Sequence, residues 1–118
     1  MGTKEGSTRR RWPPTTAALD ALDALVEEAT IDANGVSEQR VGFYTMLAEH
    51  LVVPFDVERL GITVTVERIE MTDDEHIVAM CRCGRVRQAI SLLDLPIPTP
   101  PPPGAEWIAA HRRWTRWQ

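Results

Sequence analysis

Apolar residues recur at helical spacing in the first third of the chain. Leu19, Leu22, Leu25 and Val26 would form one buried stripe on a helix that Thr15 or Thr16 can cap and that runs to about Ala29. The sequence Asn34-Gly35 predicts a turn, because both residues tolerate positive φ. A second helix is predicted to begin at an N-cap on Ser37 and to continue to about Val52. Its expected buried face consists of Val41, Tyr44, Leu47, Ala48 and Leu51.

The period of the pattern changes from helical to strand-like after Pro54. Ile62, Val64 and Val66 alternate with polar residues, which predicts a half-buried strand, and the alternation slips around Arg68-Ile69, which predicts a bulge or a strand end. Further strands are expected at Ile77–Cys83, around Val86 to Leu92, and at 55–59. Such short strands with tight connections form an antiparallel meander, which could curl toward a small SH3-like barrel.

The C-terminal part combines a proline-rich connector with a helix. Six of the nine prolines lie between Pro96 and Pro103, which predicts a stiff polyproline II connector. A helix is expected from Ala105 to about Trp117, with one face formed by Trp107, Ala110, His111, Trp114 and Trp117. The prediction is therefore an α+β fold: a single domain over residues 15–118 that follows a disordered basic tail at 1–14.

The acidic residues are concentrated in the middle of the chain. Residues 15–80 contain 14 of the 17 acidic residues against three arginines, which gives this window a net charge of −11, whereas both ends are basic. Carboxylates that lie close together repel one another, and a bound cation relieves that repulsion. The segregation therefore points toward cation binding.

Two turns would expose acidic oxygens. One carries Asp32, Asn34 and Glu38, and the other carries Asp73, Asp74 and Glu75. Calcium takes oxygen ligands from carboxylates, amides, backbone carbonyls and water, so both turns are candidate calcium sites. The first turn is no EF-hand, because, counted from Asp32, Gly35 stands at position 4 instead of 6 and Phe43 stands at position 12 instead of Glu. The alternatives are an Asx-type turn at Asp32 and Asn34, and a solvated hairpin loop at Asp73–Glu75.

Other kinds of site are weakly indicated. The sequence contains no Gly-x-Ser-x-Gly, Gly-x-Gly-x-x-Gly or phosphate-binding Gly-x-x-x-x-Gly-Lys motif, and we expect no catalytic activity. Cys81 and Cys83 are expected to be reduced cysteines that fill strand positions, and we expect no disulfide between them. His50 is expected at a helix edge, His76 could join a metal site, and His111 is expected to pack against the tryptophans.

Partners and location follow from charge and hydropathy. An acidic body repels phosphates, so nucleic acid is an improbable partner despite the Trp and Arg residues near the C-terminus. No apolar run is long enough to cross a membrane, and the first residues lack an apolar secretory segment. We therefore expect a cytoplasmic protein with no membrane partner.

Several segments, taken in order, resemble a known family. These are Ile31-Asp32-Ala33-Asn34-Gly35, Glu38-Gln39, Leu51-Val52-Val53-Pro54-Phe55, Val64-Thr65-Val66, Gln88 to Leu95, and Trp107 to Trp114. The set is similar to the cyanobacterial calcium-binding protein family over roughly residues 25–114. The resemblance implies a small acidic domain that binds Ca²⁺ without EF-hands, with Asp32 and Glu38 as the matching positions. The basic residues Arg82, Arg85 and Arg87 depart from the family's acidic surface.

Two functions are compatible with the sequence. The first is a small calcium-binding protein, a buffer or sensor, that uses Asp32, Asn34, Glu38, Asp73, Asp74 and Glu75. The alternative is a metal-independent interaction module that uses its acidic face or its proline-rich segment to bind a protein partner.

Overall fold

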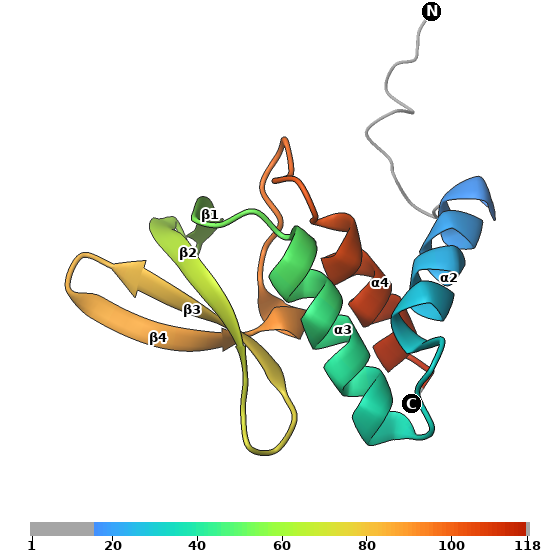
Figure 1. Ribbon diagram of the computed structural model, residues 1–118. Coiled ribbons are helices and arrows are strands. Elements are labelled where there is room, and N and C mark those ends of the chain that lie inside the picture. The colour runs from blue at the N-terminus through green and yellow to red at the C-terminus, as the bar shows by residue number, and fades with distance from the viewer. Residues whose placement is uncertain (1–15, 118) are drawn as a thin grey trace, which may run out of the picture.

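The computed structural model describes residues 16–117, which form an α+β fold in the predicted order (Figure 1). Two helices precede a four-stranded antiparallel sheet, and one helix follows it, so the predicted fold class is confirmed. None of the described helices is long and apolar enough to cross a bilayer. The predicted tail at 1–14 lies outside the described residues. The elements are α2 Thr16–Thr30, α3 Val36–His50, β1 Phe55–Arg59, β2 Ile62–Met71, β3 Ile77–Cys83, β4 Val86–Ser91, the 3-10 helix η1 Leu92–Asp94, and α4 Glu106–Thr115.

The sheet is an open meander in the order β1-β2-β3-β4. Its register shifts between Val66 and Arg68, close to the slip in alternation that predicted a bulge. β1 and β4 remain the two edges, so the expected curling into an SH3-like barrel does not occur. Helices α3 and α4 instead supply apolar side chains to the same core as the sheet, which therefore needs no second sheet wall.

The core lies between one face of the sheet and the helices. The alternation in β3 buries Ile77, Ala79 and Cys81 on this inner face, and their neighbours Val78, Met80 and Arg82 lie on the outer face. Phe43 and Leu47 of α3 enter the core from the helical side. The other elements and the connector before α4 contribute further buried residues: Val57, Val66, Ile90, Leu92, Leu95, Trp107, Ile108, Ala110 and Trp114.

Helix α3 buries Leu47 as predicted, but its buried face is rotated from the predicted one. Phe43 is fully buried, whereas Val41 is 47% exposed. The cause is a close approach of α2 at Gly42, where an added Cβ would lie 2.0 Å from the carbonyl oxygen of Ala29. No side chain fits between the two helices at this position. Helix α3 is therefore oriented with Gly42 toward α2 and Phe43 in the core.

The start of α3 also differs from the prediction. Gly35, not Ser37, occupies the N-cap position and provides no side-chain hydrogen bond. Ser37 lies in the first turn, where its hydroxyl is free to contact another element. This shift places Ser37 in the candidate site described below.

The C-terminal segment positions α4 against α3 as expected from its aromatic stripe. Trp107, His111 and Trp114 are buried, but Trp117 lies beyond the helix end and is 58% exposed under the guanidinium of Arg113. The connector before α4 bends at Thr99 and Pro100, so it does not run as one polyproline II helix as predicted.

Candidate functional site

The loop between β2 and β3 is a tight, hydrogen-bonded turn. The backbone N–H of Thr72 donates to the carbonyl of His76 at 2.8 Å, and the N–H of Glu75 donates to the carbonyl of Thr72 at 2.9 Å. The Thr72 hydroxyl accepts a further bond from the N–H of His76 at 3.1 Å. Glu75 adopts a positive φ of 68°. These contacts fix the direction of Glu75 relative to the loop.

Glu75 connects this loop to the first turns of α3. Its carboxylate accepts a hydrogen bond from the Ser37 hydroxyl, and its other oxygen lies 3.1 Å from Nη1 of Arg40. The Ser37 hydrogen bond and the Arg40 charge hold the pKa of Glu75 below its ordinary value. Residues 35 or more positions apart in the sequence are thereby joined at one end of the molecule.

The turn between α2 and α3 is closed by backbone bonds and one carboxylate. The N–H of Ala33 donates to the carbonyl of Thr30 at 3.0 Å, and the N–H of Asn34 donates to Oε1 of Glu38 at 2.9 Å. The second contact resembles half of a capping box, in which an acidic residue of the first turn satisfies a backbone donor before the helix. Glu38 therefore has a local structural role.

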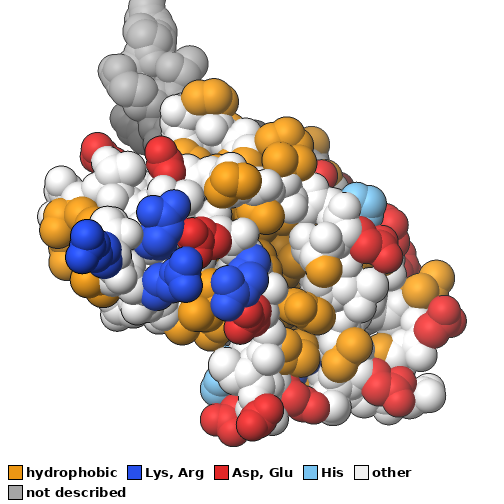
Figure 2. All heavy atoms as spheres, turned by 60° about the vertical axis from the view of Figure 1, so that its left-hand side comes forward, with side chains coloured by type: hydrophobic (Ala, Val, Ile, Leu, Met, Phe, Trp, Pro, Cys, Tyr) orange, Lys and Arg blue, Asp and Glu red, His pale blue; other side chains and the backbone are white. Residues whose placement is uncertain are grey.

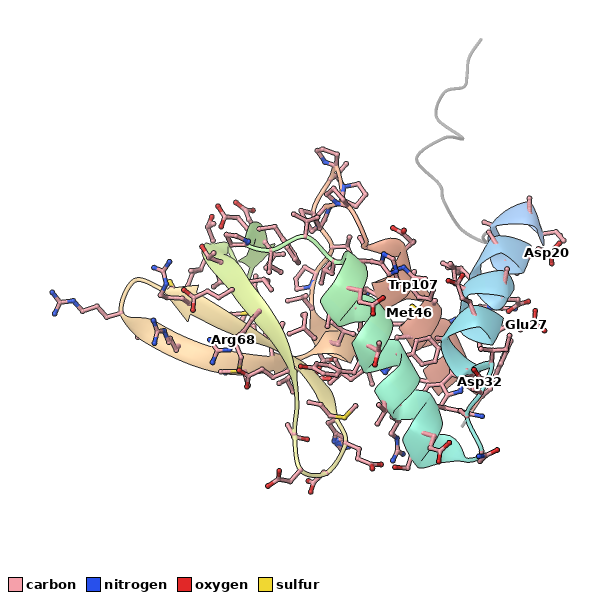
Figure 3. The ribbon with its side chains drawn as sticks, in the orientation of Figure 1. Asp20, Glu27, Asp32, Met46, Arg68 and Trp107 are labelled. Carbon is pink, nitrogen blue, oxygen red and sulfur yellow. The ribbon has the colours of Figure 1, made fainter. Side chains whose placement is uncertain are left out.

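The structure brings together some of the predicted calcium ligands and separates others. The backbone N–H of Asn34 donates to the Glu38 carboxylate, and Glu75 contacts Ser37, the residue before Glu38. Asp32, Asp73 and Asp74 are exposed, and their side chains make no hydrogen bond or ion pair within residues 16–117. Asp32 lies at the α2 end of the turn (Figure 3). Across this described part of the chain, no group of three His, Cys, Asp or Glu side chains converges as a metal site would require.

A cavity of about 510 Å³ lies beside the same loop. Arg40 and Glu75 form part of its wall, and His111 and Trp114 line it from α4. His111 is 7% exposed, and its Nδ1 has no hydrogen-bond partner among residues 16–117. Burial, assisted by the nearby charge of Arg112, lowers the pKa of His111 to about 4, so the imidazole is neutral near pH 7.

A basic cluster occupies the part of the sheet that projects beyond the helices (Figure 2). Arg82 of β3 and Arg87 of β4 are directly opposite each other in the register. Nε of Arg82 lies 2.6 Å and Nε of Arg87 lies 3.6 Å from the two carboxylate oxygens of Glu67, which lies at the bulge of β2. The hydrogen bond and charge of Arg82, with the charge of Arg87, lower the pKa of Glu67.

The sequence prediction missed the residues that connect these regions. Ser37 and Arg40 lie three residues apart at the start of α3, a spacing that places both side chains on one helix face, and this signal was available. The contact between Glu67 and the two arginines depends on the bulge and the strand register, which no local pattern specifies. The predicted packing of His111 against the tryptophans is observed: it lies 6.0 Å from Trp114, measured between ring centroids.

Comparison with known proteins adds no relative to this description. No protein-family model matches the chain, and no curated protein or solved structure matches it. The resemblance to the cyanobacterial calcium-binding family therefore stays a prediction that depends on the sequence segments quoted above.

Proposed function

We propose that the chain is a small calcium-binding protein, a buffer or sensor, and that Ca²⁺ binds where the β2–β3 loop meets the α2–α3 turn. The observation that carries this proposal is the contact of Glu75 with Ser37. Through it, two acidic turns that are far apart in the sequence share one end of the molecule. The side chains that would hold the ion are Asn34, Glu38, Asp74 and Glu75.

The donor chemistry of these residues suits Ca²⁺. Carboxylate and amide oxygens are hard ligands, and a flexible shell of backbone carbonyls and waters can complete the coordination. The exposed Asp74 at the loop tip has no competing partner among the described residues, so it is free to move toward an ion. Asp32 and Asp73 are less favourable ligands, because neither lines the cavity whose wall Asp74 shares with Glu75.

Arg40 opposes calcium binding at this place. Its guanidinium already neutralises Glu75 at 3.1 Å, and the Asn34 backbone already uses one oxygen of Glu38. An ion must replace these contacts before it gains its own. We therefore expect weak affinity, with a dissociation constant of about 10⁻⁴ to 10⁻³ M.

Calorimetric titration of the full chain with CaCl₂, and then with MgCl₂, tests the proposal. Calcium should bind and should raise the melting temperature, because a ligand that binds only the native state stabilises it. The double variant Glu38→Gln/Glu75→Gln keeps the side-chain shapes, removes two charges, and should lose most of the calcium-dependent shift. Arg40→Gln should bind calcium more tightly than the parent chain, because the competing guanidinium is gone.

The matched control is Glu27→Gln, which removes one charge from an exposed position on α2 (Figure 3). Its calcium response should equal that of the parent chain. Each variant is compared with itself with and without calcium, so that a change in intrinsic stability does not enter the result. A double variant that responds to calcium like the parent chain would remove this junction as the site.

A metal-independent interaction module is the second candidate, and the exposed charge on α2 favours it. Asp20, Glu27 and Glu28 are solvent-exposed along this helix. The proline-rich segment suits this role less, because domains that read polyproline II helices need an unbent segment and the chain bends at Thr99 and Pro100. Saturable binding of an oligolysine probe, lost in Glu27→Lys and unchanged by calcium, would favour this candidate over the first.

A further inference from the structure

The half of the sheet nearest the β1–β2 and β3–β4 turns is not covered by a helix (Figure 1). Its inner face forms an open groove of about 400 Å³ between the β1–β2 and β3–β4 turns. Ile62 and Val86, which line this groove, are 54% and 66% exposed. Cys81 and Ile90 line its inner end and are buried, so the groove continues the apolar face that the helices cover further along.

The hairpin beside this groove is basic in an otherwise acidic molecule. Residues 77–91 contain Arg82, Arg85 and Arg87 and no acidic residue. Arg82 and Arg87 share the single carboxylate of Glu67, and Arg85 has no ion-pair partner among residues 16–117. Three guanidiniums with one carboxylate between them can accept further anionic groups, most favourably planar carboxylates.

β4 is also an edge strand. It pairs with β3 on one side only, and its residues Val86, Arg87, Gln88 and Ala89 are all exposed. The unpaired backbone groups of an edge strand form a template for another extended chain. In the register, Val86 and Gln88 face the groove with Cys83 and Cys81, whereas Arg87 lies on the opposite face with Arg82.

We propose that the β4 edge and the adjoining groove bind an extended segment of a partner protein in which acidic and apolar residues alternate. Added beside β4, such a segment would direct every second side chain toward Arg82 and Arg87 and the others toward Val86 and the groove. The charge of the hairpin selects the acidic residues, and the exposed apolar face selects their neighbours. This surface lies apart from the proposed calcium junction and does not depend on it.

A nucleic-acid strand is the competing occupant. It is less favourable, because stacking on aromatic side chains supports single-strand binding and residues 77–91 contain no aromatic residue. The groove also offers apolar surface, which contributes little to phosphate binding and suits a peptide side chain.

The test uses the full chain and a fluorescein-labelled peptide of alternating glutamate and valine, with EDTA present to exclude calcium. Anisotropy should show saturable binding, and amide shifts should cluster at Val86 to Ala89 and along the groove. A peptide of the same composition with all glutamates grouped at one end should bind clearly more weakly, because it cannot present the two kinds of side chain to opposite faces.

Charge reversal identifies the surface. Arg87→Glu should weaken peptide binding roughly tenfold. The control Arg116→Glu, an equal charge change at an exposed position after α4, should leave it unchanged. Arg85→Glu is a second charge reversal, at the β3–β4 turn. Because Arg85 has no ion-pair partner among residues 16–117, this change removes no such contact, and weaker peptide binding by this variant would report a binding defect and not a folding defect.

Three results would overturn the proposal: no binding of the alternating peptide at millimolar concentration, equal binding of the grouped peptide, or equal weakening by Arg87→Glu and Arg116→Glu. Tighter binding of single-stranded oligothymidylate than of the peptide, at the same salt concentration, would assign the hairpin to nucleic acid instead.

Discussion

The two halves of the sheet carry similar apolar residues in different surroundings. In the half next to the helices, Val66 and Ala79 are fully buried beneath the helical layer. In the projecting half, Ile62 and Val86 lie on the same inner face and remain more than half exposed. The strand pattern is continuous, so the difference comes from what covers the sheet and not from the strands.

The contrast suggests a division of roles within the molecule. The covered half contains most of the buried apolar surface that stabilises the fold, and the projecting half contains little buried apolar surface. A surface that contributes little to folding can keep exposed apolar groups and a basic edge, which are unfavourable for solubility but useful for binding a partner. The following changes test this division from its largest expected effect to its smallest.

The largest effect is expected from truncation in the covered half. Phe43→Ala should lower the free energy of unfolding by about 3–5 kcal/mol, because it removes a fully buried ring and leaves a cavity. The ring centroid lies 5.2 Å from that of Trp114 and 5.5 Å from that of His111, so these contacts are lost as well. Urea unfolding followed by circular dichroism measures the change.

Trp117→Ala is the aromatic control for this truncation. Its side chain is exposed, and its ring centroid lies 4.7 Å from Cζ of Arg113. The decrease in the free energy of unfolding should therefore stay below about 1 kcal/mol. Similar losses in the two variants would show that the helical layer does not stabilise the fold as described.

Acidification should act on the same covered region through His111. The folded pKa of about 4 lies below the ordinary value of 6.5, so the unfolded chain takes up the proton first as the pH falls. The contribution of this residue to stability is constant above pH 6.5, decreases between pH 6.5 and 4, and is constant again below pH 4. The total decrease should be about 3 kcal/mol.

Unfolding free energies measured across this pH range, for the parent chain and for His111→Phe, check the prediction. The difference between the two chains should change with pH over the stated window, because the variant has no imidazole there. A difference between the two chains that stays constant from pH 6.5 to pH 4 would contradict the assignment to His111.

The element types were predictable because they depend on local periodicity. The helical spacing of Leu22, Leu25 and Val26 and the alternation of Ile62 to Val66 specify a helix and a strand without reference to any distant residue. The face that α3 buries was not predictable in this way. It depends on the approach of Ala29 to Gly42, a contact between two helices that apolar spacing within α3 does not reveal.

The candidate site shows the same limit. The acidic residues of the two turns could be identified from the sequence, and their exposure at loop tips follows from turn chemistry. The pairing of Glu75 with Ser37 and Arg40 could not be identified from the sequence, because it depends on how a hairpin loop is placed over a helix. Charge counting also missed that Arg40 neutralises one of the predicted calcium ligands.

The helix crossing that sets the covered half can be tested directly. Gly42→Ala should lower the free energy of unfolding by about 1–3 kcal/mol, because the new methyl group meets the backbone oxygen of Ala29 and the helices must move apart. Gly35→Ala is the matched control, since nothing lies within 4 Å of its added Cβ. Chemical denaturation compares the two, and a larger loss in Gly35→Ala would contradict the described crossing.

The smallest effect is expected in the projecting half, where it is also the most informative. Val86→Thr keeps a β-branched side chain at an exposed position, so the free energy of unfolding should change by no more than about 0.5 kcal/mol. Ile90→Thr makes a comparable change on the same face of the same strand, but at a residue only 5% exposed, and should cost clearly more. Since strand and face are shared, the part of the difference that exceeds the one additional methylene lost at Ile90, about 0.8 kcal/mol, reports the helical cover. Equal losses would mean that the projecting half is covered in solution, and a loss at Val86 that depends on protein concentration would identify a second copy of the chain as the cover.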